Sequence, residues 1–326
     1  MIDVERKSDQ EQVTHEQIIQ EQIMEEQIII IGAGPAGIAA TIQLRRFGFD
    51  PLVFEKDDVG GLLLNANLVE NYPGFPSGIA GSDLAPLLKD HVLRFHPRIR
   101  KEEVTCLDWN GQTFIVRTDE NTYSSKFVVL ASGTHPRSIS IPGIPEVQQQ
   151  HGLGGMISYD VTSLHKIRGE HIAIIGAGDA AFDYALNLAE WNTVTILNRS
   201  NSYHCLELLY SRVQKDSGIT YRTCVNVTKI IEKDDSLNLF LDEGGGRGEE
   251  DSVLFVDKLV IAIGREPELG FLTDTVHNRR TELVEEGLLY VVGDVGNGLL
   301  RQVSIAIGDG VKAAMMIDQI VSRTMK

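Results

Sequence analysis

The 326-residue sequence contains few cysteines, and they are poorly placed for pairing. Cys106, Cys205 and Cys224 lie far apart and form no Cys-X-X-Cys motif. An odd number of widely spaced cysteines indicates no disulfide framework, so we expect a reducing compartment, the cytoplasm. Their spacing does not resemble that of a ligand set either, and we expect no metal site.

Basic charge is also scarce, and long apolar runs are missing. Thirty Lys and Arg residues face 46 Asp and Glu residues, which gives a net charge of −16. This balance argues against binding to nucleic acid or to anionic lipid, because both need a basic surface. No apolar run approaches the roughly 18 residues of a membrane span, so we expect no membrane partner. The acidic N-terminus does not resemble a signal peptide.

The composition that remains is typical of an α/β protein with two domains. Hydrophobic residues make up 42% of the chain, and 31 glycines indicate many tight turns. Residues 1–27 differ, because Glu-Gln recurs at five-residue intervals and eight acidic residues face two basic ones. We favour a solvated, partly helical extension for this segment. A partner-binding or dimer-bracing arm is the alternative.

A glycine-rich turn begins the globular part of the chain. Residues 28–31 are four isoleucines that favour a strand, and residues 35–47 favour a helix. Between them, Gly32-Ala33-Gly34-Pro35-Ala36-Gly37 has the spacing that lets backbone N–H groups approach a pyrophosphate at a helix N-terminus. Glu55 ends the next strand, where a carboxylate accepts hydrogen bonds from a ribose.

The same unit recurs in residues 170–199, which predicts two mononucleotide-type folds in one chain. Its turn reads Gly176-Ala177-Gly178-Asp179-Ala180-Ala181. Asn198 replaces the carboxylate that Glu55 supplies in the first copy, and Arg199 follows it. The missing negative charge and the arginine weakly favour NADPH over NADH. Alternatively, Arg199 only caps a strand end at the surface.

Further strand ends complete the pattern. Residues 130–134 and 261–267 each end a strand in small residues, and Gly293-Asp294 precedes Arg301-Gln302-Val303 at the start of the last helix. Residues 69–76 read VENYPGFP, after Gly60-Gly61-Leu62. With these motifs, residues 27–323 resemble the low-molecular-weight thioredoxin reductase family of FAD- and NAD(P)-dependent flavoproteins.

The resemblance implies an α/β fold with two Rossmann-like domains of the three-layer ββα type. An NAD(P)-binding-like domain, residues 140–266, would be inserted into a discontinuous FAD domain, residues 28–139 and 267–326. The implied FAD-binding residues are Gly32, Ala33, Gly34, Pro35, Ala36, Gly37, Glu55, Lys56, Gly61, Leu62, Asn71, Val104, Ser132, Gly133, Gly293, Asp294, Arg301, Gln302 and Val303. The implied NAD(P)-binding residues are Gly176, Ala177, Gly178, Asp179, Ala180, Arg199 and Gly264. Such proteins are usually homodimers.

The departures from the family pattern restrict the function. The family has two redox cysteines just before the second turn, where this chain has Asp160 and Ser163. A carboxylate and a hydroxyl have no two-electron redox couple, which excludes thioredoxin reduction at these positions. One of three coenzyme-binding arginines remains, as Arg199, and the path from Pro267 to Gly293 is compressed.

We therefore expect a FAD-dependent oxidoreductase that passes electrons from NAD(P)H to a small-molecule or protein acceptor other than a disulfide. Asp160 and Ser163 are weak candidates for a catalytic role. One alternative is a ferredoxin- or flavodoxin-NADP reductase. That class usually has a C-terminal extension over the flavin, which we do not expect after Lys326. The other alternative is a FAD-binding protein with a degraded coenzyme site and a structural or regulatory role.

Overall fold

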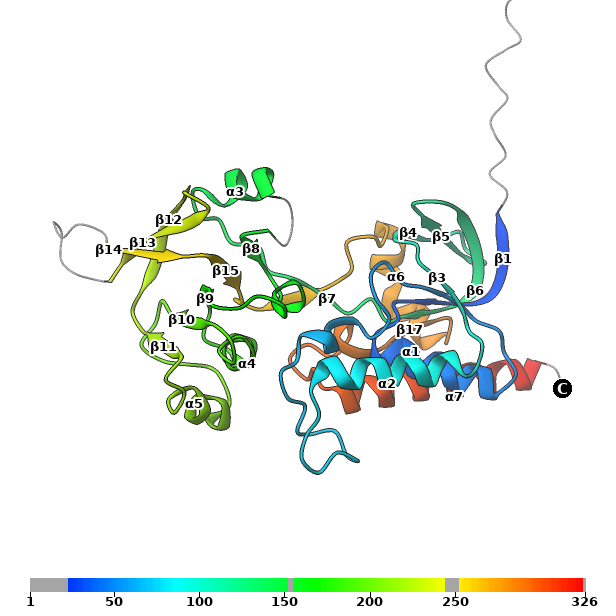
Figure 1. Ribbon diagram of the computed structural model, residues 1–326. Coiled ribbons are helices and arrows are strands. Elements are labelled where there is room, and N and C mark those ends of the chain that lie inside the picture. Colours follow the sequence, from blue (N-terminus) through cyan, green and yellow to red (C-terminus); the bar gives the residue numbers. More distant parts are fainter. Residues whose placement is uncertain (1–22, 152–154, 244–251, 325–326) are drawn as a thin grey trace, which may run out of the picture.

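The computed structural model describes residues 23–151, 155–243 and 252–324, which form two groups of sheets and helices (Figure 1). The first group is built on a seven-stranded sheet in which β1 pairs in parallel with β2 and β6. β3 and β17 extend its parallel part, and β4 and β5 form an antiparallel meander with β6. The strands are β1 (Met24–Ile31), β2 (Leu52–Phe54), β3 (Arg98–Arg100), β4 (Val104–Trp109), β5 (Phe114–Thr118), β6 (Thr122–Leu130) and β17 (Leu289–Val291).

Helices cover this sheet, and Figure 1 shows α1, α2 and α7 on the same side of it. The helices are α1 (Pro35–Arg46), α2 (Gly81–Leu93), α6 (Asp274–Glu285) and α7 (Val303–Thr324). α1 begins at a proline, which has no N–H to leave unpaired at the first helical position. α1 and α7 cross closely, because a Cβ on Gly310 would lie 2.1 Å from the carbonyl oxygen of Ala36. The buried side chains of both helices join the isoleucines of β1 in one core.

The second group contains a five-stranded parallel sheet in the order β11-β10-β9-β15-β8, which is typical of a mononucleotide-binding unit. These strands are β8 (Ile157–Ser158), β9 (His171–Ile175), β10 (Thr193–Leu197), β11 (Ile219–Arg222) and β15 (Lys258–Ile261). A three-stranded antiparallel sheet stands beside it, with β12 (Asn226–Lys233), β13 (Ser236–Asp242) and β14 (Ser252–Val256). Its helices are α3 (Ile144–His151), α4 (Asp179–Leu188) and α5 (Glu207–Val213).

A two-stranded ribbon connects the two groups. β7 (Thr134–Pro136) leads away from the first sheet, and β16 (Arg265–Pro267) returns antiparallel to it. Figure 1 shows β7 between the two halves of the molecule. The chain therefore enters and leaves the second group at one place. The domain boundaries expected from the sequence, 139/140 and 266/267, fall just after β7 and within β16.

Two segments differ from the sequence-based expectation. β1 begins at Met24 rather than at residue 28, so the last Glu-Gln pair belongs to the strand. It does so because residues 24–26 pair with β6, and both carboxylate oxygens of Glu26 accept hydrogen bonds from Arg98, at 2.7 and 2.8 Å. The rest of the acidic extension, residues 1–22, lies outside the described residues.

The compressed path from Pro267 to Gly293 holds a helix, α6. Thr273 caps it, since its hydroxyl accepts the Val276 N–H at 3.4 Å and donates to Asp108 in β4 at 2.7 Å. Val276 and Leu283 of α6 are buried against the β4–β5 meander. A short segment therefore covers that face of the sheet by forming a helix.

None of the described helices is long and apolar enough to cross a membrane.

Candidate functional site

The first glycine turn connects β1 to α1 and leaves an open space at its helix end. Gly32 has φ +99°, and a Cβ there would lie 2.3 Å from the carbonyl oxygen of Ala131. A Cβ on Gly37 would lie 1.9 Å from the carbonyl oxygen of Gly32. Gly34, in contrast, has nothing within 4 Å of its Cβ position. The first and third glycines are therefore needed for packing, and the second leaves room for a ligand at the N-terminus of α1.

Glu55 stabilises this turn as well as facing the cavity next to it. Its Oε2 accepts the Ala33 N–H at 2.7 Å, and its Oε1 accepts the Asp57 N–H at 2.9 Å. Each oxygen keeps a lone pair for another donor, such as a ribose hydroxyl. The position expected from the sequence therefore fits a ribose, and it also fixes the turn.

The turn opens into a large cavity of about 1120 Å³. All of the expected FAD-binding residues line it except Ala33 and Gly37, which serve the turn instead. Of the expected NAD(P)-binding residues, only Asp179 and Ala180 line it. Gly176, Ala177, Gly178, Arg199 and Gly264 do not. The cavity thus extends from the first turn to the N-terminus of α4 in the second nucleotide unit.

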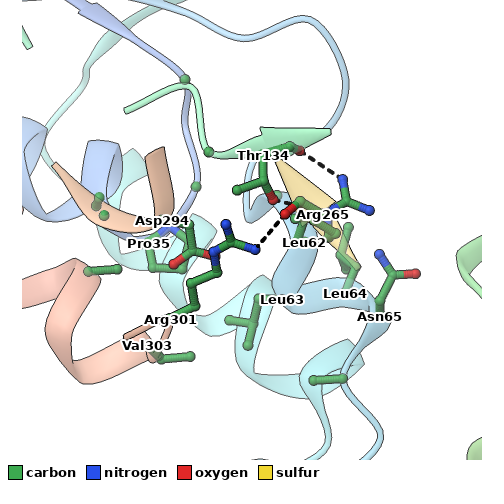
Figure 2. A pocket seen from close by; sticks show the side chains of 18 of the residues that line it. Pro35, Leu62, Leu63, Leu64, Asn65, Thr134, Arg265, Asp294, Arg301 and Val303 are labelled. Atoms are coloured by element: carbon green, nitrogen blue, oxygen red, sulfur yellow. Dashed lines mark hydrogen bonds between the residues drawn. The ribbon is translucent and has the colours of Figure 1, made fainter. Parts of the chain in front are cut away.

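A cluster of partly buried polar side chains lies where the two units meet (Figure 2). Arg265 donates from Nε to the Thr134 hydroxyl at 3.0 Å and from Nη2 to the Thr134 carbonyl at 2.7 Å. Arg301 donates to the Arg265 carbonyl at 3.1 Å. Burial raises the pKa of Asp294, and the nearby Arg301 and Arg265 oppose this rise. Burial likewise lowers the pKa of Arg265.

These features fit a FAD molecule. The open faces of Gly34 and Gly133, which have nothing within 4 Å of their Cβ positions, leave room for the pyrophosphate and the flavin chain. Arg301 Nε is buried with no hydrogen-bond partner among the described residues, so a donor remains available in the cavity. The start of α7 directs backbone N–H groups to the same place, where they favour negative charge on a ligand.

The loop that follows is hydrogen-bonded to the second glycine turn, in which Gly178 has nothing within 4 Å of its Cβ position. The Asp179 carboxylate accepts the Leu206 N–H at 2.7 Å, and the Ala177 carbonyl accepts the His204 N–H at 2.8 Å. Asn198 is buried and bonds within its own loop, to Ser200, Ser202 and the hydroxyl of Tyr221. Arg199 is exposed. Asn198 therefore holds the loop in shape, and Arg199 is the charged residue of this strand end that faces solvent.

Part of the segment 160–163, which the resemblance places at the position of the dithiol, borders the cavity. Asp160 and Thr162 line the cavity, and the Thr162 hydroxyl donates to Asp160 Oδ1 at 2.8 Å. The N–H groups of Val161 and Thr162 donate to Asn65 Oδ1 at 2.9 and 3.1 Å. Ser163 is exposed outside the cavity, because the buried Val161 and Leu164 fix the opposite side of the short turn. Of the two weak catalytic candidates, only Asp160 therefore reaches the cavity.

Several lining residues escaped the sequence analysis. Arg265 follows Gly264 in a motif that was identified, so a signal existed for it. Asn65, Asp183 and Tyr184 lie in a 3-10 helix and in α4, where no motif marks single residues. Their place in the site depends on how the two units pack, which local sequence does not encode.

A dinucleotide-type turn that opens into a large cavity, with the helix after a second such turn beginning at the same cavity, is typical of a two-nucleotide flavoprotein reductase. Comparison with known proteins agrees: the family model "Pyridine nucleotide-disulphide oxidoreductase" matches residues 26–310, and the chain belongs to this family. It is thus a flavin-dependent NAD(P)H oxidoreductase of the thioredoxin reductase-like type.

The chain is also similar to individual relatives and solved structures over most of its length. The chain is 33% identical to a bifunctional thioredoxin reductase/thioredoxin of Mycobacterium leprae, over 88% of this chain and 64% of that protein. It is 30% identical to a thioredoxin reductase of Mycolicibacterium smegmatis, over 88% and 94%. The crystal structure of T. acidophilum thioredoxin reductase superposes with a TM-score of 0.77 at 29% identity, over 91% of this chain and 99% of that one.

Proposed function

We propose that this protein passes electrons from NAD(P)H through FAD to an acceptor that is not a disulfide, and that it does not reduce thioredoxin. One observation carries the proposal. The cavity that joins the two nucleotide units is lined by Asp160 and Thr162 at the place of the dithiol, and no cysteine lines it among the described residues. Bound FAD would accept a hydride from the nicotinamide and release the electrons to the acceptor.

Each domain has a distinct part in this proposal. Residues 28–139 and 267–326 hold FAD, with the pyrophosphate at Gly34 and a ribose at Glu55. Residues 140–266 bring the coenzyme to the same cavity at Asp179 and Ala180. Arg199 is the cation available for a 2′-phosphate, which supports a weak preference for NADPH.

The remaining cysteines support an acceptor other than a disulfide. Burial raises the pKa of Cys205 to about 11, so its thiol stays protonated near pH 7 and is a poor nucleophile. Cys106 accepts a hydrogen bond from Arg117, and Cys224 is exposed. All three are free, which fits a reducing cytoplasm.

A homodimer is part of the proposal. α2 and α7 carry exposed apolar side chains that a second copy would cover, namely Leu87, Leu93, Ile305, Met315 and Met316.

Anaerobic spectroscopy of the FAD-loaded protein tests this function. We expect NADPH or NADH to bleach the visible flavin band, and air or an artificial acceptor such as ferricyanide to restore it. With oxidised thioredoxin as the acceptor, an assay of disulfide reduction should show no turnover by this protein above background. A protein whose flavin is not bleached by either nucleotide, or one that reduces thioredoxin, would refute the proposal.

A further inference from the structure

The part of the cavity that α4 contributes contains an unpartnered phenol. Tyr184 lies in the second turn of α4, is 8% exposed and lines the cavity. Its hydroxyl forms no hydrogen bond with another described residue and is not one of the fully buried unpartnered atoms, so it is accessible from the cavity. Burial raises the pKa of Tyr184 to about 12, so the hydroxyl keeps its proton. A hydroxyl that borders a cavity and has no protein partner is available to a polar group of a ligand.

A guanidinium and a carboxylate stand close to this phenol. Arg265 and Asp160 are both within electrostatic reach of Tyr184 and line the same cavity. Arg265 uses Nε and Nη2 on Thr134, so Nη1 remains available. Asp160 uses Oδ1 on Thr162, so Oδ2 remains available. Two hydrogen-bond donors, the Tyr184 hydroxyl and Arg265 Nη1, and one acceptor, Asp160 Oδ2, are thus available in this part of the cavity.

The same cavity is also lined by apolar side chains. Leu206, Leu208 and Leu209 line it at the start of α5, and Leu206 and Leu208 are 61% and 51% exposed. Leucines and free hydrogen-bond donors in one cavity suit a flat, mostly apolar molecule with a polar oxygen at its edge. A peptide disulfide or a highly charged metabolite lacks this combination.

Building on the proposed function, we propose that Tyr184 and Arg265 bind a quinone-type acceptor, with the Tyr184 hydroxyl donating to one carbonyl oxygen and Arg265 stabilising negative charge on it. Reduction of a quinone places negative charge on its oxygens, and fixed donors in a buried site stabilise such charge strongly. The leucines would hold the ring.

The overall reaction balances with reduced nicotinamide as the reductant. NAD(P)H and one proton reduce the quinone to the hydroquinone and leave NAD(P)⁺. Two electrons and one proton come from the nicotinamide by way of the cofactor. Tyr184 supplies the second proton: its O–H bond breaks as the hydroquinone O–H bond forms. The phenolate then regains a proton from water.

Binding without turnover is the first test. 1,4-Naphthoquinone is titrated onto the oxidised, FAD-loaded protein without NAD(P)H, and the change in the flavin absorption band gives the Kd. We expect Tyr184→Phe to raise the Kd about 10-fold, because one buried hydrogen bond is lost. Tyr290→Phe is the control, since it removes an unpartnered phenol hydroxyl that is buried outside the cavity.

Separate half-reactions are the second test. The flavin is photoreduced without NAD(P)H and mixed with naphthoquinone, and the return of the visible band is followed. We expect Tyr184→Phe to slow this step about 100-fold, with FAD content, unfolding midpoint and bleaching by NAD(P)H unchanged. Tyr290→Phe should match the native protein in every measurement.

The outcomes separate this inference from the proposed function. A native protein that neither binds the quinone nor is reoxidised by it refutes the inference alone. The same holds if Tyr184→Phe slows only bleaching by NAD(P)H, because the phenol then contacts the nicotinamide. A native protein that NAD(P)H does not bleach refutes the proposed function, while the photoreduced sample still decides the inference.

Discussion

Asn198 and Glu55 end equivalent strands of the two nucleotide units, yet their side chains differ in what they leave available. Glu55 accepts two backbone N–H groups and still faces the cavity. Asn198 is 4% exposed, and both ends of its amide are bonded inside the loop 198–202. It cannot turn to a ribose without leaving those groups unpaired. This leaves the exposed Arg199 as the residue of this strand end that we propose for the adenosine end of the coenzyme.

Replacement of Arg199 tests this at the residue scale. If Arg199 pairs with a 2′-phosphate, Arg199→Ala should raise the KM for NADPH about 10-fold, as expected for one exposed charge-assisted contact. The KM for NADH should change less than about 2-fold. Arg323→Ala, which removes an exposed charge at the end of α7, is the control. Equal changes for both coenzymes would show that Arg199 does not read the phosphate.

The site residues that belong to repeated motifs could be predicted from the sequence, and those outside such motifs could not. The glycines and Glu55 could be located because their spacing reflects a turn that only certain residues permit. Tyr184 reaches the cavity through the position of α4, and neighbouring residues give no sign of it, whereas Arg265 in β16 follows Gly264 of an identified motif. Ser163 was expected beside Asp160, but the buried Val161 and Leu164 turn it outward.

At the scale of elements, the start of α1 shows how one turn separates folding from binding. Gly34 has φ −72°, which any residue adopts, and its Cβ direction is open. The Cβ direction of Gly37 points at the backbone of Gly32. The second unit tolerates Ala181 at the equivalent position, 3.5 Å from a Cβ on Gly176. The two turns therefore differ at the third position, where only the second contains a methyl group.

Two alanine substitutions distinguish these roles. Gly34→Ala should leave the stability of the FAD-free protein unchanged within about 0.5 kcal/mol but abolish FAD retention, because its methyl group fills the ligand space. Gly37→Ala should destabilise the FAD-free protein by roughly 1–3 kcal/mol, because the backbone must move apart. Denaturant unfolding and the ratio of flavin to protein absorbance measure both. If Gly34→Ala still purifies with FAD, the pyrophosphate lies elsewhere.

At the scale of the molecule, the two halves contact each other beyond the connecting ribbon. Asn65 accepts hydrogen bonds from the segment 161–162, and Arg212 of α5 forms a two-pronged ion pair with Glu70 at 2.7 and 2.9 Å. Asp183 of α4 accepts the Asn67 N–H at 2.8 Å. The sequence predicted both nucleotide units but not this contact, since it joins residues more than 90 positions apart through single side chains.

Asp183 makes this contact sensitive to pH. Burial raises its pKa from 3.8 to about 6, the N–H groups of Asn67 and Leu68 and the charge of Arg212 oppose the rise, and Asp179 adds to it. The contact state binds more protons than the separated state between pH 4 and 6. Stability of the contact is therefore full below about pH 4 and falls as pH rises through 6, by up to on the order of 3 kcal/mol.

Asp183→Asn should remove this dependence, since an amide cannot ionise and can still accept both N–H groups through its oxygen. We expect the unfolding midpoint of the native protein, relative to that of the variant, to fall as the pH rises from about 4 to 6. Asp90→Asn, which changes an exposed carboxyl of α2, should keep the native profile. Parallel profiles for the native protein and Asp183→Asn would contradict the assignment. A convergence of the two at low pH supports it, because the protonated Asp183 and the asparagine then carry the same charge.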